Sequence, residues 1–259
     1  SILGLIFCYN IYLKTQNTLK SVLCFNKSYT CIKSYVYNNL FFKIMGQINQ
    51  AVNVSDVINT FAIKNFVETG TGTGESLGNV LSLPESKELT LYSIELIDQI
   101  YEYLTGKFKN DNLNLIKGYS HEEIVKIMDT ISNEPTLFWH DAHFPGADFK
   151  IDGATYTSEK DPVKRIPLEY ELRGVINSGR DISKDIFIID DLRVYKDGDY
   201  ETGNWDLREQ AGADNIDFVY ELFDDTHIII ESLVAQGFLI LFPINTEVSV
   251  CKRLVNGVV

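Results

Sequence analysis

The stretch FVETGTGTGES, residues 66–76, decides the fold. An apolar segment ends at Glu68, and glycines then follow at every second position, at Gly70, Gly72 and Gly74. Glycine at these positions lets a ligand approach the backbone, because no side chain stands in the way. The stretch therefore predicts a buried strand, a nucleotide-cradling turn and the start of a helix.

The spacing of these glycines excludes two common nucleotide motifs. A dinucleotide fingerprint, G-x-G-x-x-G, would place its last glycine at Glu75 when counted from Gly70. A P-loop would continue with Gly-Lys-Ser/Thr, which is missing here. The remaining pattern, E-x-G-x-G-x-G, resembles the first motif of class I S-adenosylmethionine-dependent methyltransferases. That resemblance implies that Glu68 and the three glycines hold the amino-acid end of the cofactor, although such a turn can also be a plain strand-to-helix connection.

Charge is distributed unevenly along the 259 residues, of which 45% are apolar. Residues 1–44 contain five lysines and no acidic residue, so all 36 acidic residues follow, with 18 basic residues. A surface this acidic repels phosphate backbones, so nucleic acid is not expected as a partner. A small-molecule or glycan acceptor fits better, and the sequence leaves homo-oligomer formation open.

The first 44 residues form an N-terminal extension with no clear periodicity. Three interpretations stay open: a basic aromatic arm, a slightly favoured helical cap, and translated sequence upstream of a start at Met45. The apolar residues 1–13 are fewer than the ~20 that a membrane span needs. The four cysteines form no C-x-x-C pair, which argues against a zinc ribbon or disulfide framework and favours a cytoplasmic location.

Residues 45–259 are predicted to form one α/β domain, because helical and strand patterns alternate from residue 50 onward. The expected strands are 65–68, 89–95, 113–117, 136–141, 185–191, 227–234 and 237–242, the last two as an antiparallel hairpin. Ser120 to Glu123 predicts a capping box that opens a helix. The fold class is thus a Rossmann-like, seven-stranded, mostly parallel sheet flanked by helices.

Acidic residues stand at the carboxyl ends of the predicted strands, where open α/β sheets bind ligands. Glu95 ends the second strand, 27 residues after Glu68, as in the methyltransferase layout where this acid accepts hydrogen bonds from the ribose hydroxyls. After the third strand the family usually has an acid near the adenine. This chain has Tyr119 and Ser120 there. Tyr119 could stack on the adenine ring, and the Ser120 hydroxyl could form a hydrogen bond with it.

The block FWHDAHF, residues 138–144, together with IIDD, residues 188–191, resembles a bacterial and viral group of uncharacterised class I methyltransferase-like proteins. The likeness covers residues 60–195, and His140 departs from it, because that group usually has an apolar residue there. Asp141, Asp190 and Asp191 also resemble the cation site of the catechol O-methyltransferase type. This resemblance implies Mg²⁺ or Mn²⁺ bound by their carboxylates, whereas the plain alternative is that these acids only cap strand ends.

These observations predict an S-adenosylmethionine-dependent methyltransferase that methylates an oxygen of a small molecule or sugar with divalent-metal assistance. His143 is the expected catalytic base beside Asp141, and His140 is the less favoured choice. The loops 143–165 and 196–215 are expected to cover the substrate. Two alternatives remain: a non-catalytic cofactor-binding or regulatory protein, and another sugar- or nucleotide-modifying enzyme on the same fold.

Overall fold

The computed structural model describes residues 47–213 and 215–257. The predicted extension, residues 1–44, lies outside the described residues, and its boundary with the main domain stays a prediction.

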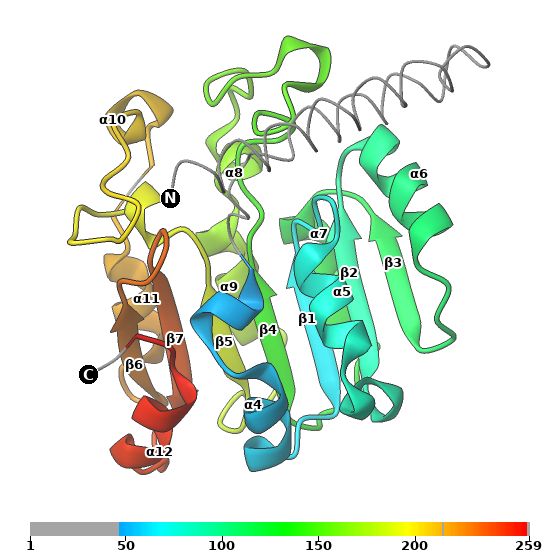
Figure 1. The fold of residues 1–259 in the computed structure, drawn as a ribbon, viewed down its shortest axis with the longest axis vertical. Coiled ribbons are helices and arrows are strands. Elements are labelled where there is room, and N and C mark those ends of the chain that lie inside the picture. The colour runs from blue at the N-terminus through cyan, green and yellow to red at the C-terminus, as the bar shows by residue number, and fades with distance from the viewer. Residues whose placement is uncertain (1–46, 214, 258–259) are drawn as a thin grey trace, which may run out of the picture. The chain divides into compact units, whose positions relative to one another are not determined.

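Strands and helices alternate through most of the described chain (Figure 1). The strands are β1 (Asn65–Thr69), β2 (Thr90–Glu95), β3 (Leu113–Lys117), β4 (Thr136–His140), β5 (Ile186–Ile189), β6 (His227–Ser232) and β7 (Phe238–Pro243). The helices are α3 (Ile48–Ala51), α4 (Val54–Phe61), α5 (Glu75–Ser82), α6 (Asp98–Lys107), α7 (Ser120–Met128), α8 (Pro162–Arg165), α9 (Leu168–Asn177), α10 (Arg208–Ala211), α11 (Asp217–Phe223) and α12 (Val248–Leu254), with short 3₁₀ turns at Pro84–Glu88, Ile151–Gly153 and Leu192–Val194.

The strands form one seven-stranded sheet in the order β3-β2-β1-β4-β5-β7-β6. Strands β1 to β5 are parallel, whereas β7 pairs antiparallel with both β5 and β6. The predicted fold class and the C-terminal hairpin are therefore confirmed. The chain order reverses between β1 and β4, and in doubly wound sheets a ligand crevice opens at the carboxyl ends of such a pair.

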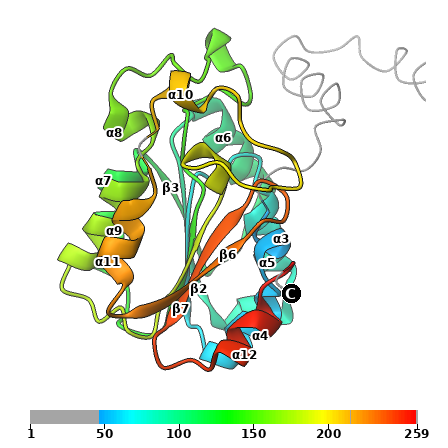
Figure 2. The same cartoon turned by 90° about the vertical axis from the view of Figure 1, so that its left-hand side faces the viewer.

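Both faces of the sheet are covered by helices (Figure 2). Helices α3, α4, α5 and α12 cover one face, and α7, α9 and α11 cover the other. Successive residues of one strand alternate between these layers, so Phe138 packs toward one core and Trp139 toward the other. Burial on both faces explains why β4 and β5 are almost continuously apolar in sequence.

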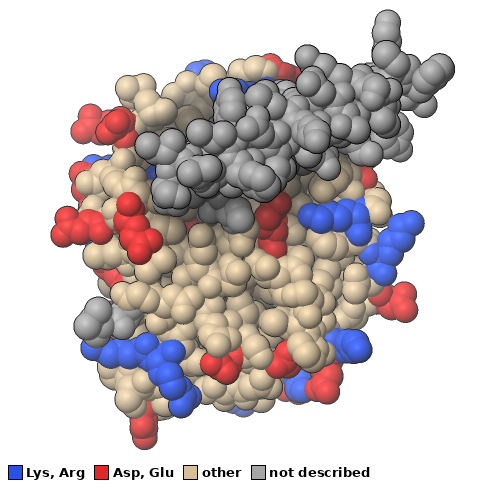
Figure 3. All heavy atoms as spheres, in the orientation of Figure 1, with Lys and Arg blue, Asp and Glu red and all other residues tan. Residues whose placement is uncertain are grey.

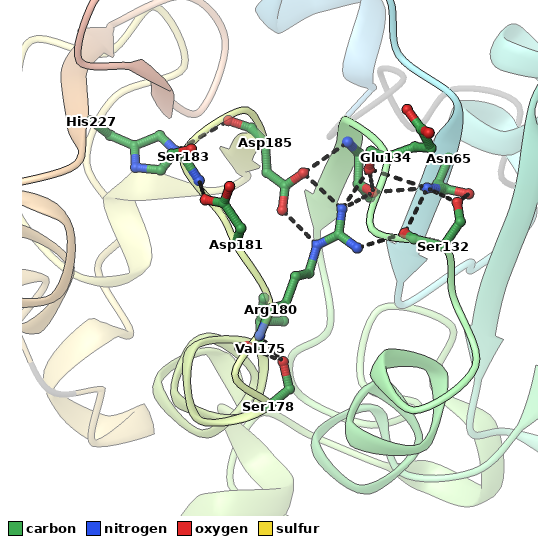
Figure 4. A network of polar contacts seen from close by, with 11 residues as sticks. Asn65, Ser132, Glu134, Val175, Ser178, Arg180, Asp181, Ser183, Asp185 and His227 are labelled. Carbon is green, nitrogen blue, oxygen red and sulfur yellow. Dashed lines mark hydrogen bonds and ion pairs between the residues drawn. The ribbon is translucent and has the colours of Figure 1, made fainter.

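A buried guanidinium joins the amino-terminal ends of β1, β4 and β5 (Figure 4). Arg180 Nε donates to Asp185 Oδ2 at 2.7 Å, and its other nitrogens donate to the carbonyl oxygens of Ser132 and Glu134 and to Thr136 Oγ1. The side chains of Arg180 and Asp185 are only 5% and 1% exposed. Asn65 Nδ2 donates into the same group of acceptors. This network holds the amino-terminal ends of these three strands together. The acidic residues lie at the other, carboxyl-terminal ends of the strands.

Some local predictions were wrong. The capping box does not form, because Tyr119 is the N-cap of α7 and Ser120 is already its first helical residue. Strand β5 is shorter than predicted, since Asp185 and the two acids after Ile189 lie outside the ladder. Helix α12 has no counterpart among the predicted elements; it is only seven residues long.

The face seen in Figure 3 carries Lys and Arg side chains singly or in small groups among Asp and Glu. The described residues form no continuous basic surface there. Among the helices of the described chain, none combines the length and hydropathy that a membrane crossing would require.

Candidate functional site

The glycine turn lies between the carboxyl ends of β1 and β2. The N–H groups of Gly70 and Thr71 both donate to the Ile94 carbonyl, and Thr71 Oγ1 contacts Ser93 Oγ at 2.6 Å. All three glycines have positive φ angles. A Cβ at Gly70 would lie 2.6 Å from the Asp141 carbonyl oxygen, and one at Gly74 would lie 2.6 Å from the Phe108 ring. Backbone packing therefore requires glycine at position 70, independently of any ligand, whereas a Cβ at position 74 would displace the Phe108 and Leu104 side chains.

Alanine at Gly70 should destabilise the fold more than alanine at Gly72. Both substitutions put a side chain at positive φ, which costs roughly 1–2 kcal/mol. Only the one at Gly70 also meets backbone, since a Cβ at Gly72 would meet nothing closer than the Phe149 ring at 3.6 Å. Thermal unfolding of the two variants checks this expectation, and equal melting temperatures would contradict it.

Glu68 lies beneath the turn and is 1% exposed. Its carboxyl accepts hydrogen bonds from the Ser93 hydroxyl and from the Leu77 backbone. Burial raises the pKa of Glu68 to about 8, with smaller contributions from the charges of Glu95 and Glu75. A protonated, buried Glu68 supports the turn from below, and its predicted contact with a cofactor stays a prediction.

The raised pKa of Glu68 makes stability depend on pH. Above its unfolded-state pKa of 4.5 the unfolded chain releases this proton while the native protein keeps it, so stability falls as pH rises toward about 8. The loss from this group should reach about 3 kcal/mol by pH 7. Glu68→Gln keeps a neutral side chain of the same shape and should flatten the dependence. Urea unfolding of both proteins from pH 5 to pH 8 measures the difference, and parallel curves would refute the assignment.

Glu95 is placed beside the turn, as predicted from its spacing. Gly72 N donates to Glu95 Oε2 at 2.9 Å, and Ile97 N donates to Oε1 at 2.7 Å. Burial raises the pKa of Glu95, and these backbone N–H groups partly oppose that effect. Backbone N–H groups therefore orient this carboxylate, which can only accept hydrogen bonds, beside the turn.

Tyr119 and Ser120 follow β3 at the same edge of the sheet. Lys164 Nζ lies 4.7 Å from the centre of the Tyr119 ring and covers one of its faces. Ser120 is buried at the first residue of α7. One face of the Tyr119 ring is therefore already occupied, which restricts stacking by any ligand to the other face.

The carboxyl groups of Asp141 and Asp190 meet where β4 and β5 end. Each lies directly after its strand, and the two are hydrogen-bonded to each other. Burial raises the pKa of Asp190 to about 8 and that of Asp141 well above its usual range, and the charge of the neighbouring carboxylates adds to both effects. The predicted meeting of these two acids is therefore seen, as a pair that shares a proton.

His143 and Asp191 lie beside this acid pair. His143 Nε2 is 3.6 Å from Asp141 Oδ1 and 3.8 Å from Asp191 Oδ2, and both ring nitrogens are buried without a hydrogen-bond partner among the described residues. Asp191 has a φ of 52° and accepts a 2.8 Å hydrogen bond from Arg193 Nε. The site thus holds an imidazole between two carboxyl groups, with a fixed guanidinium behind one of them.

The acids match a divalent cation in chemistry but not in arrangement. Carboxylate oxygens suit Mg²⁺ or Mn²⁺, and Asp190 Oδ1 is buried without a partner. However, the described part of the chain contains no group of three or more His, Cys, Asp or Glu side chains arranged to hold a metal ion. A cation would have to displace the proton between Asp141 and Asp190, and Asp191 is already paired with Arg193.

His140 points away from this site into the protein. Its Nδ1 lies 2.7 Å from Glu171 Oε2, both side chains are 1% exposed, and Thr69 Oγ1 donates to the same carboxylate oxygen at 3.0 Å. The imidazole lies nearly parallel to the rings of Phe138 and Phe187, at 6.0 and 6.2 Å between ring centres, and these two rings stack on each other at 4.7 Å. His140 therefore cannot reach a methyl acceptor in this arrangement, which leaves His143 as the imidazole beside Asp141 and Asp191.

An aromatic cluster joins the two long loops that follow β4 and β5. Phe144 and Tyr156 belong to the first loop and Trp205 to the second, and their ring centres lie 5.1–5.3 Å apart. His143 contacts the same cluster through Phe144, at 5.1 Å. Both loops project from the edge of the sheet where β4 and β5 end (Figure 1).

Sequence reasoning missed several residues of this site. Glu171, Arg193 and Phe149 were not singled out, although Arg193 follows the Asp190-Asp191 pair by two residues and could have indicated a partner. Glu171 occupies an ordinary position in an amphipathic helix, and Phe149 lies in a loop. No sequence signal separates these two from a helix-surface acid and a loop aromatic.

Comparison with known proteins supports the fold. No family model and no curated protein matches the sequence. The fold is similar to that of the SAH-bound methyltransferase PaMTH1 from Podospora anserina, with a TM-score of 0.51 and 14% identity over 89% of this chain and 95% of that one. An SAH-bound O-methyltransferase from Bacillus cereus gives a TM-score of 0.46 and 14% identity over 89% and 97% of the chains. The topology of the sheet and the similarity to PaMTH1 show that the chain has the class I methyltransferase fold.

Proposed function

We propose that this protein transfers a methyl group from S-adenosylmethionine to a hydroxyl of a small molecule or sugar. The observation that carries the proposal is Glu95, whose carboxylate is oriented by Gly72 N and Ile97 N beside the glycine turn. An acceptor-only group held this way is suited to a ribose diol. The similarity to the SAH-bound Podospora methyltransferase is consistent with this choice of ligand.

The chain's own residues would assist the transfer in two ways. The acceptor oxygen forms its bond to the methyl carbon as the carbon–sulfur bond breaks, and the electron pair stays on sulfur. His143 would take the acceptor proton, because its ring nitrogens have no hydrogen-bond partner among the described residues and face the strand ends. Asp141 Oδ1 and Asp191 Oδ2, at 3.6 and 3.8 Å from the same ring nitrogen, Nε2, would position the imidazole.

Metal assistance is a separate part of the proposal: Asp141, Asp190 and Asp191 would supply carboxylate oxygens only after a cation displaces the proton that Asp141 and Asp190 share and the side chains rearrange. A divalent cation bound there would make an acceptor hydroxyl more acidic. The support is the donor chemistry and the partnerless Asp190 Oδ1. Calorimetric titration with Mn²⁺, in wild type and in Asp190→Asn, tests this part separately from transfer. Equal Mn²⁺ affinity in both proteins would remove the metal from the proposal.

The proposal as a whole is tested by incubating the protein with S-adenosylmethionine and a panel of phenols, sugars and other alcohols. Formation of S-adenosylhomocysteine that depends on an acceptor is the expected result, and an EDTA arm shows whether a cation is required. Binding of S-adenosylmethionine without any transfer across the panel would favour the alternative of a non-catalytic cofactor-binding protein. Failure to bind it at all would contradict the proposal.

A further inference from the structure

The loop between β4 and α9 lies on the proposed cofactor site, not only on the acceptor side. We call residues 144–165 the lid. A Cβ at Gly72 would be 3.6 Å from Phe149 Cζ, and one at Gly146 would be 3.8 Å from Ile97 Cδ1. The N–H groups of Gly72 and Ile97 donate to the Glu95 carboxylate. The lid therefore lies next to both of these residues, with the Phe149 ring at ordinary van der Waals distance from the place that a Cβ of residue 72 would take.

Access to Glu95 is closed in this conformation. The residue is 5% exposed, although its carboxylate is engaged only by backbone donors and has acceptor capacity left. Farther along the same edge, Lys164 of the lid covers one face of the Tyr119 ring. The lid thus spans the site from the glycine turn to the position expected for adenine, and a nucleoside could not reach Glu95 without moving it.

The lid is built to move as a unit. Its ends are joined by a 2.7 Å hydrogen bond from Phe144 N to the Arg165 carbonyl. Among the described residues, the hydrogen bonds made by 145–164 all join partners within 144–166, including the one from Tyr156 to Asp148. Among the described residues, lifting the lid would therefore break no hydrogen bond to the sheet, but it would separate Lys164 from the Tyr119 ring and Phe149 from the glycine turn. Compact loops with adjoining ends commonly act in this way.

We propose that Phe149 is a gate: it occupies part of the cofactor's place in the ligand-free protein, and the lid must lift before S-adenosylmethionine can bind. This inference rests on the proposed function and adds that the binding-competent state is a minor one. The apparent affinity is then reduced by the fraction of molecules with an open lid. Loss of the Phe149 ring raises that fraction and with it the association rate.

Stopped-flow binding of S-adenosylhomocysteine, followed by tryptophan fluorescence, tests the gate. Trp205 packs at 5.1 Å against Phe144 and Tyr156 at the base of the lid, so its emission should report lid movement. Phe149→Ala should increase the association rate constant about 5- to 30-fold, as expected for loss of one ring's packing. Tyr170→Ala, which removes an exposed ring on α9, is the matched control and should keep the wild-type rate.

Hydrogen exchange of the ligand-free proteins gives a second readout that needs no cofactor. The amides of Gly72 and Ile97 should exchange faster in Phe149→Ala than in wild type, because a larger fraction of the molecules has an open lid. Binding with equal rate constants, or unchanged exchange at both amides, overturns the gate and leaves the proposed function standing. Absence of S-adenosylhomocysteine binding in all three proteins, checked by calorimetry, overturns the proposed function and the gate together.

Discussion

Replacing Arg180 with alanine is expected to lower the free energy of unfolding by about 3–5 kcal/mol, because it leaves a buried carboxylate without its partner. Asp185 is 1% exposed at the side chain and receives two of its hydrogen bonds from Arg180. The same substitution also removes donors from the carbonyls of Ser132 and Glu134. Urea unfolding monitored by circular dichroism measures the loss.

Arg173→Ala is the matched control for this prediction. Arg173 forms an ion pair with Glu169 on α9, but the two side chains are 44% and 33% exposed. Exposed pairs contribute roughly 0–1 kcal/mol, so this variant should unfold almost as wild type does. Similar losses of unfolding free energy in the two variants would mean that the Arg180 network does not stabilise the amino-terminal ends of the strands.

Replacing His143 with alanine is expected to lower the rate of methyl transfer by roughly 10²–10⁴, the usual contribution of a general base. The affinity for S-adenosylmethionine should stay unchanged, because His143 faces Asp141 and Asp191 and not the glycine turn. Transfer is followed as S-adenosylhomocysteine formation with an acceptor identified from the panel.

The pH dependence of the methyl-transfer rate distinguishes a catalytic base from a residue with only a structural role. If His143 is the base, the pH profile of the transfer rate should differ between the wild-type protein and His143→Ala. A variant that keeps both the rate and the pH profile of wild type would show that another group accepts the proton, or that none is needed.

The architecture could be predicted because its signals are local. The glycine turn follows an apolar strand, and apolar runs of strand length recur with helical segments between them. Two parallel strands that are neighbours bring their carboxyl ends together, so the meeting of Asp141 and Asp190 followed from the fold. The position of Glu95 at the end of β2 could also be predicted, because the apolar strand pattern stops there. Its contact with a cofactor stays a prediction.

The rest of the site depends on side-chain direction and on long-range partners, which spacing does not encode. Glu68 was expected to end its strand as Glu95 does, but β1 continues to Thr69 and the Glu68 carboxyl accepts a hydrogen bond from Ser93. His140 and His143 are three residues apart, but only His140 has Glu171 as a buried partner, 31 residues away. The packing that restricts Gly70 and Gly74 involves residues far along the chain, so the glycine spacing alone could not show it.

The central claim is that the turn and Glu95 bind S-adenosylmethionine, and calorimetric titration of the wild-type protein, Glu95→Ala and Glu102→Ala tests it most directly. Glu102 is an exposed acid on α6, and its variant should bind as wild type does. Glu95→Ala should bind about 10- to 150-fold more weakly, as expected for loss of charge-assisted hydrogen bonds worth ~1.5–3 kcal/mol. An affinity that Glu95→Ala leaves within twofold of wild type, or no binding by wild type, would contradict the claim.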